Sequence, residues 1–239
     1  MAEDGQRPRK VRPLASSKPK LGLMVTVSVG TGEKARDFHV HEEVIKRHSD
    51  FFNAALAGDR WQEGVERKVS LPEDKPKTFE GFQSFIYSGL SFLEDEASRQ
   101  VSDEGRRADK ELVVIKHAWK LADKLQSCSY RDALTDSLAL KMVAENIVPL
   151  GMQVGLEAGI SMSTGLFRLL LDVAICCWTV EPFSRLKLED TPSAFVLKLI
   201  TGLAESGDRT VRDKPWLKED CHYHDHGEEK PCYKTMFTY

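Results

Sequence analysis

The sequence predicts an α+β protein with three short strands, a series of helices and a helical C-terminal extension. Three short segments with period-2 hydrophobicity predict the strands, at residues 24–30, 36–40 and 68–71. Long stretches with apolar residues at helical spacing predict the helices, and they dominate the chain after residue 76. With 239 residues, 41% of them hydrophobic and 30% charged, the chain has the composition of the globular class.

The net charge and the cysteine content indicate which class of partner and which cellular compartment to expect. The formal net charge of -3 gives no global field that would attract nucleic acid or an anionic membrane, so protein partners are expected. The most apolar run, residues 165–180, carries Arg168 and Asp172 and is shorter than the ~20 residues that span a bilayer, which favours a buried helix. The cysteine count is odd, and the neighbouring pair Cys176 and Cys177 is interpreted as inert core thiols. A reducing compartment, cytoplasmic or nuclear, is therefore expected.

Residues 1–22 are predicted to form a disordered basic leader, because they combine basic residues with prolines and hold almost no large apolar side chain. They contain no apolar core of a signal peptide. Two interpretations of the basic cluster stay open. A solvated tail is favoured, and a nuclear import signal is the alternative.

The first two strands are predicted to form a hairpin. Val25, Val27 and Val29 alternate with polar residues, and glycines at 30 and 32 turn the chain toward the second strand. A tight hairpin turn is favoured over a nucleotide-binding loop, because the segment lacks the further glycine and the lysine of such a loop.

Two short helices, almost end to end, are predicted over residues 44–55, with Ser49 as the cap of the second. Pro72 ends the third strand, and a helix starts at Pro76. The buried face of this helix is mostly aromatic and should form the centre of the core; its members are Phe79, Phe82, Phe85 and Ile86.

Downstream of this helix, residues 93–110 are charged and poor in large apolar groups, which predicts an exposed loop. Two helical stripes follow, at residues 112–125 and 130–145. After a stretch rich in glycine, an apolar helix is predicted within residues 165–180 and a short final one at 195–203.

Several sequence motifs occur together in the block from residue 38 to residue 89. They are Phe38, Val40, His41, Val44, Ile45, His48, Ser49, Phe51 and Phe52; Gly58, Arg60, Trp61, Glu63 and Gly64; Leu71, Pro72, Glu73 and Asp74 with Pro76 and Phe79; and Phe85, Ile86, Tyr87, Ser88 and Gly89. In this combination the chain resembles BTB/POZ domains, especially their fungal branch, over about residues 24–200. The expected organisation is a leader at 1–22, a BTB/POZ domain at 23–145, a helical extension at 146–205 and a Cys/His-rich tail at 206–239.

The resemblance implies a small three-stranded sheet flanked by a cluster of helices. It also implies protein association rather than chemistry. Many members of the family form homodimers, and some dock on a cullin scaffold as substrate adaptors of a ubiquitin ligase, so self-association is expected first and a cullin-bound adaptor is the alternative. Four apolar residues are candidates either for the core, which is favoured, or for a dimer seam: Val25, Val44, Ile45 and Phe52.

No catalytic constellation stands out in the sequence. A nucleophile beside a base, paired carboxylates in a cleft or a phosphate-cradling glycine loop would indicate an enzyme, and none is evident. His41 and His48 lack a third partner, so they are expected to be capping or core histidines. The prediction is a protein without catalytic activity.

The tail carries the chemically richest stretch of the chain, residues 221–232, with two cysteines and three histidines. Zinc takes four ligands in a tetrahedron, usually Cys thiolates and His nitrogens. The preferred metal set is Cys221, His224, His226 and Cys232, and it adds a third hypothesis, a zinc-containing nuclear regulator. The alternative is an exposed His-rich tail that packs through Trp216, Tyr223 and Tyr233.

Overall fold

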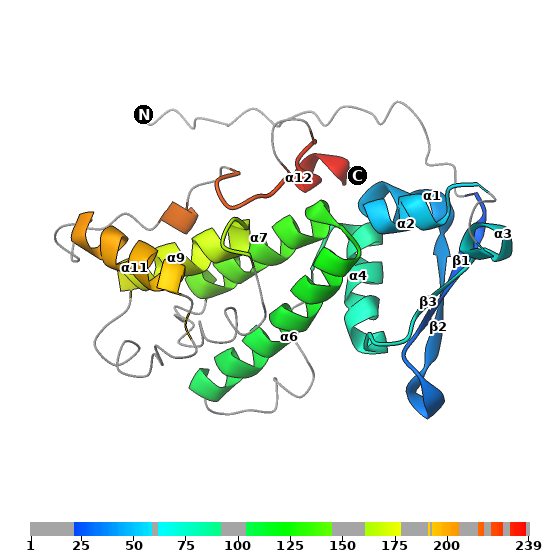
Figure 1. The fold of residues 1–239 in the computed structure, drawn as a ribbon, viewed down its shortest axis with the longest axis horizontal. Helices are drawn as coiled ribbons and strands as arrows, with labels where there is room; N and C mark the ends of the chain where they lie inside the picture. Colours follow the sequence, from blue (N-terminus) through cyan, green and yellow to red (C-terminus); the bar gives the residue numbers. More distant parts are fainter. Residues whose placement is uncertain are drawn as a thin grey trace, which may run out of the picture.

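The structure of the chain is a computed structural model. It describes residues 22–58, 62–91, 104–144, 161–177, 191, 193–205, 215–217, 221–226 and 230–237. The molecule is elongated, with a three-stranded sheet at one end and helices α9 (Gly165–Cys177) and α11 (Ser193–Glu205) at the other (Figure 1). Helices α6 (Glu104–Lys124) and α7 (Cys128–Ala144) lie between these two ends. The predicted leader lies outside the described residues.

The sheet contains β1 (Met24–Val29), β2 (Arg36–His41) and β3 (Lys68–Leu71) in the order β2-β1-β3. β1 pairs antiparallel with β2 and parallel with β3, so the sheet is mixed. The hairpin turn passes through η1 (Gly32–Lys34), and Gly30 and Gly32 have φ values of +85° and +62°, which favour glycine. The three predicted strands and the predicted hairpin are thus confirmed.

Helices α1 (Glu42–His48) and α2 (Asp50–Ala55) follow β2 almost without a break, and α3 (Gln62–Glu66) precedes β3. The Ser49 hydroxyl accepts a hydrogen bond from the Phe52 amide at 3.1 Å and donates one to the Leu125 carbonyl at 2.6 Å. The first bond caps α2, as predicted, and the second ties its start to the end of α6.

Helix α4 (Pro76–Ser88) begins with a proline in its first turn and ends at Gly89, whose φ of +71° is left-handed. Its aromatic face is fully buried, as predicted. The Phe79 ring lies 4.9 Å from Phe38 and 5.8 Å from Phe82, and Phe85 lies 4.9 Å from Tyr130. Each of these side chains contributes roughly 1.5–3 kcal/mol on burial, so this ring cluster joins sheet, α4 and α7 into one core.

The expected loop at residues 93–110 is partly wrong, because α6 already begins at Glu104. Residues 93–103 lie outside the described residues. The segment after residue 104 is rich in Glu, Arg, Ala and Lys, which are strong helix formers even where no apolar face is present. A lack of apolar residues therefore marked the polar end of a long helix here rather than a loop.

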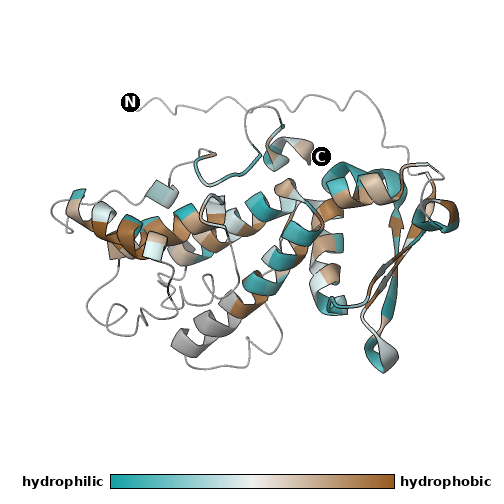
Figure 2. Cartoon of the chain, viewed as in Figure 1, coloured by the Kyte–Doolittle hydropathy of each residue, from teal (hydrophilic) through white to brown (hydrophobic). Residues whose placement is uncertain are grey.

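Helices α9 and α11 pack against each other, and α9 also packs against α7. Brown, hydrophobic residues cover much of α9 and α11 in Figure 2, and the Phe167 and Phe195 rings meet edge to face at 5.7 Å. η4 (Pro215–Leu217) and the short α12 (Tyr233–Met236) complete the described elements. None of the helices described is long and apolar enough to span a membrane.

The four candidates for the core or for a dimer seam differ in burial. Val25, Ile45 and Phe52 are completely buried inside the chain, whereas Val44 is only partly buried. This burial fits the core role that the sequence analysis favours for the first three residues. A dimer seam stays a prediction for all four.

Of the two histidines of this region, His48 is a core residue, as expected, whereas the side chain of His41 makes no capping hydrogen bond at the start of α1. The backbone amide of His41 donates to the Tyr87 hydroxyl at 3.0 Å, and the Nδ1 atom of His41 lies 2.8 Å from the same oxygen. His48 is buried, with its Nδ1 atom 3.3 Å from the Ser129 hydroxyl.

Candidate metal centre

The C-terminal tail lies along α7 (Figure 1). Residues 221–226 form a loop of turns, and residues 230–237 lead into α12, which packs on the same helix. From α7, Asp132 and Asp136 reach this tail; they stand four positions apart and so share one helical face.

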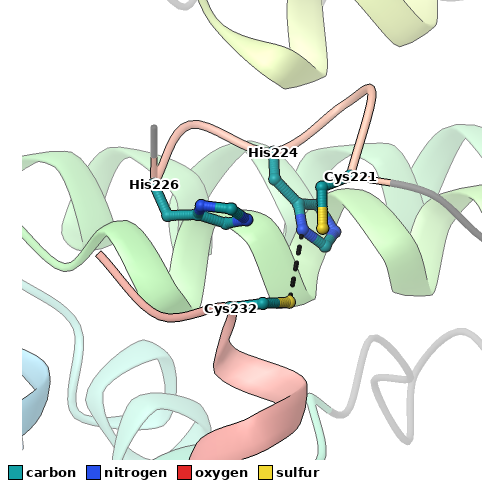
Figure 3. Close-up of side chains that lie close together, drawn as sticks. All are labelled: Cys221, His224, His226 and Cys232. Carbon is teal, nitrogen blue, oxygen red and sulfur yellow. Dashed lines mark hydrogen bonds between the residues drawn. The ribbon is translucent and has the colours of Figure 1, made fainter. Parts of the chain in front are cut away.

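Four side chains of the tail converge, and they are the set that the sequence predicts: Cys221, His224, His226 and Cys232. One ligand atom from each lies within 4.8 Å of the others. Figure 3 shows the two rings and the two sulfur atoms turned toward one another beside α7. His222 lies outside the cluster, with its Nε2 atom 3.9 Å from the Asp172 carboxylate.

His224 is held on both sides of its ring. Its Nε2 atom lies 3.0 Å from the Asp136 carboxylate, and its Nδ1 atom lies 3.6 Å from the Cys232 sulfur. A proton on Nε2 is donated to the carboxylate, which leaves the Nδ1 lone pair facing the sulfur atom. The side chain of His224 is only 1% exposed, so this orientation is fixed by packing as well.

Asp136 is the anion that orients this ring. Burial by itself would raise the pKa of Asp136, but hydrogen bonds from His224, Lys234 and Tyr233 outweigh burial and lower it. The Tyr233 hydroxyl donates at 2.8 Å, and the Lys234 ammonium group lies 2.7 Å away. The carboxylate therefore stays charged and binds three groups of the tail.

Asp132 and Asp225 join the loop to two helices. The Asp132 carboxylate on α7 accepts the Asp225 amide at 2.7 Å, and the Asp225 carboxylate accepts the amide of Gly165, the first residue of α9, at 2.7 Å. Burial raises the pKa of Asp132 to about 6, although the hydrogen bond from Asp225 opposes the rise. A Cβ atom on Gly165 would lie 1.8 Å from the Tyr223 carbonyl oxygen, so only glycine lets the loop approach α9 this closely.

Arg168 fixes the backbone of the same loop. Its guanidinium group donates to the carbonyl oxygens of Ser163 at 2.6 Å, His224 at 3.0 Å and His222 at 3.3 Å. In addition, the His224 amide donates to the Cys221 carbonyl at 3.0 Å, which closes a turn between two of the converging residues. The positions of Cys221 and His224 are therefore set by the loop backbone.

The end of the tail packs on the aromatic core. The Phe237 ring stacks on His48 with centroids 5.0 Å apart and meets Phe85 edge to face at 5.3 Å. The Lys230 ammonium group lies 2.9 Å from the Asp50 carboxylate at the start of α2. The tail thus contacts α1, α2, α4, α7 and α9.

The cluster suits metal binding better than nucleophilic catalysis. Cys232, His224 and Asp136 stand in the order of a nucleophile, a base and an orienting carboxylate. However, burial and the nearby Cys221 raise the pKa of the Cys232 thiol, whereas a nucleophilic cysteine needs a lowered pKa. Two thiols with two imidazoles instead make a donor set typical of tetrahedral zinc.

Sequence reasoning missed the residues around this set. Asp132 and Asp136 could have been detected in the sequence, because they lie one turn apart on a helix with a buried face. Carboxylates at such positions usually have hydrogen-bonding or charged partners elsewhere in the protein. Arg168 was noted only as a charge in an apolar run, and nothing in the sequence links it to the tail. Tyr223 is buried and Trp216 and Tyr233 are partly buried, so the packing expected of the alternative tail is present as well.

The comparisons with known proteins concern the N-terminal half. Residues 18–136 match the family model described as the BTB/POZ domain. No curated protein matches the chain. The matched segment ends at Asp136, so the four converging residues lie outside it.

Proposed function

Residues 18–136 form a BTB/POZ domain, which is a protein–protein interaction module, and on this premise we propose that the chain acts by binding a second copy of itself. The branch of the family, the partner and the compartment stay predictions. The absence of catalytic activity also stays a prediction.

The observation that carries the proposal is an exposed apolar surface at one end of the sheet. Leu23 and Met24, at the start of β1, are 64% and 45% exposed, and Val65 of α3 is 62% exposed. Strand pairing brings the backbones of these segments to one end of the sheet, because Met24 pairs with His41 at the end of β2 and the Thr26 amide donates to the carbonyl of Arg67, two residues after Val65.

This surface, formed by Leu23, Met24 and Val65, is called the sheet-end surface. Val44 is partly buried on α1, the helix that begins directly after β2, so it can extend the surface. Removing large apolar side chains from water stabilises an association by about 25 cal/mol per Å² of apolar area. A self-complementary contact of this kind gives a closed symmetric dimer.

Light scattering coupled to gel filtration tests self-association directly. At tens of micromolar the full chain should show about twice the 27.0 kDa mass of one chain. The double variant Leu23→Asp/Met24→Asp should be monomeric, because a carboxylate buried without a partner costs several kcal/mol. The matched control is Leu197→Asp, which changes an equally exposed leucine on α11 at the opposite end of the molecule and should stay dimeric.

Two outcomes would contradict this proposal. A strict monomer at these concentrations would remove self-association, and loss of the dimer only in Leu197→Asp would move the contact to α11. The cullin-adaptor alternative is tested with the same variants by pull-down on the N-terminal region of a cullin. Retention of the wild-type chain there, together with a monomeric mass, would replace self-association by the adaptor role.

A further inference from the structure

We propose that Cys221, His224, His226 and Cys232 bind one zinc ion, and that this ion holds the C-terminal tail against the BTB/POZ domain. The inference does not depend on self-association, because the four residues and the sheet-end surface share no residue. It depends on the donor set, on the groups that orient it and on what the tail covers.

The distances fit a tetrahedral ion after a small contraction. Bonds of about 2.3 Å to sulfur and 2.0–2.1 Å to nitrogen place tetrahedral ligand atoms about 3.3–3.8 Å apart. The four ligand atoms lie within 4.8 Å of one another, and the Cys232 sulfur is already 3.6 Å from Nδ1 of His224. Side-chain rotations of about 1 Å close the remainder, while the loop backbone stays where its hydrogen bonds hold it.

The donor chemistry selects zinc among common divalent ions. Thiolates and imidazoles are poor ligands for Mg²⁺ and Ca²⁺, which prefer oxygen, and are the usual ligands of Zn²⁺. Two thiolates neutralise the two charges of the ion, so the cluster as a whole carries no net charge. A neutral cluster is compatible with the burial of His224 at this position.

Asp136 supplies the outer partner that zinc-bound histidines commonly have. A metal-ligating histidine usually donates its second ring N–H to a carboxylate, which fixes the tautomer and strengthens the ligand. His224 does this through Nε2 to Asp136 at 3.0 Å, and the remaining nitrogen faces the other ligands. Asp136 is thus a positioning residue in the BTB/POZ domain for a ligand 88 positions away.

The ion would join the two described segments of the tail, residues 221–226 and 230–237. Cys221, His224 and His226 belong to the loop fixed on α7 and α9, whereas Cys232 directly precedes α12. Because α12 has only four residues, its own backbone bonds cannot hold it in place. A bond from zinc to Cys232 would therefore add to the contacts of Tyr233 and Lys234 with Asp136 in keeping Phe237 stacked on His48 and Phe85.

The first test is metal content and ligand identity in the full chain, purified with a reductant that does not bind metal. Elemental analysis should find one zinc per chain. Replacement by Co²⁺ should produce the visible bands of a tetrahedral site and a thiolate charge-transfer band. Cys221→Ser and His226→Gln should lose most of the bound metal, whereas the matched controls Cys128→Ser and His222→Gln, which lie outside the cluster, should keep it.

A second variant keeps the test valid if a ligand variant fails to fold. Asp136→Asn leaves all four ligands in place and should weaken Co²⁺ binding by about 10–100-fold with an unchanged spectrum. The attachment of the tail to the domain is measured by amide hydrogen exchange of residues 232–237, which should become faster when a chelator removes the metal.

Several results would overturn the inference. A reduced chain that binds neither zinc nor cobalt would exclude the site, and so would a disulfide between Cys221 and Cys232 that persists in the presence of the reductant. Equal loss of metal in His222→Gln and His226→Gln would refute the ligand set. Metal binding without any change in amide hydrogen exchange at residues 232–237 would show that the metal does not hold the tail against the domain.

Discussion

Acidification should destabilise the folded protein through His48. This side chain is 5% exposed and packs its ring against Phe85 at 5.7 Å and Phe237 at 5.0 Å. Burial, with a smaller effect from the neighbouring Arg47, lowers the pKa of His48 from 6.5 to about 4. The folded state therefore keeps the ring neutral in a pH range where the unfolded chain binds a proton.

The direction and the size of the effect follow from this pKa difference. The contribution of His48 to stability is fully present above pH 6.5 and is lost as the pH falls from 6.5 toward 4. Between pH ~7.5 and pH ~5 the loss is about 2 kcal/mol. For a urea dependence of about 2–3 kcal/mol per M, the unfolding midpoint would move by roughly 0.7–1 M.

Asp132 acts in the opposite direction over an overlapping range. Its folded-state pKa is raised to about 6, so its contribution is present at low pH and is lost as the pH rises through that value. The pH profile of the wild-type chain alone is therefore a sum of opposing effects. A comparison with a variant at His48 isolates the histidine.

Urea unfolding of the wild-type chain and of His48→Gln should be followed across this pH range. The amide of glutamine cannot titrate, so the stability difference between the two proteins should shrink by about 2 kcal/mol on going from pH ~7.5 to pH ~5. His39→Gln, on the exposed side of β2, is the control and should follow the wild-type profile. A difference that does not change with pH would refute the buried, neutral state of His48.

Two further substitutions test the tail and the junction of α2 with α6. Gly89→Ala should cost about 2 kcal/mol, because φ is +71° and the new methyl group would lie 2.7 Å from the Phe237 ring. In a Phe237→Ala background only the cost of the positive φ remains, about 1 kcal/mol, and an unchanged cost of ~2 kcal/mol would show that the tail does not pack there. Ser49→Ala should cost about 1–2 kcal/mol in urea unfolding, because it removes a helix cap and leaves the Leu125 carbonyl without its hydroxyl donor. The control is Ser163→Ala at an exposed serine, which should change stability by less than ~0.5 kcal/mol. Equal losses of stability in the two variants would contradict the buried role of Ser49.

The local elements were predictable because their signals lie within a few residues of one another. The alternating valines of β1, the cap at Ser49 and the aromatic face of α4 are each set by periodicity or by one side chain beside its own backbone. The same logic failed at residue 104, where a polar helix end carries no periodic apolar signal. It also could not divide Val44 from Ile45, because neighbouring helical positions differ in burial only through what packs on them.

Local patterns in the amino-acid sequence were enough to predict the strands, the central aromatic helix and the kinds of ligand atom in the tail. Tertiary structure alone decided that these atoms meet, because their positions depend on α7 and α9, which are distant in the chain. The carboxylate behind His224 comes from residue 136, and the carbonyl oxygens of the loop are held by an arginine on α9. Spacing along a chain fixes which groups are available, whereas their distances in space are fixed only when separate helices pack together.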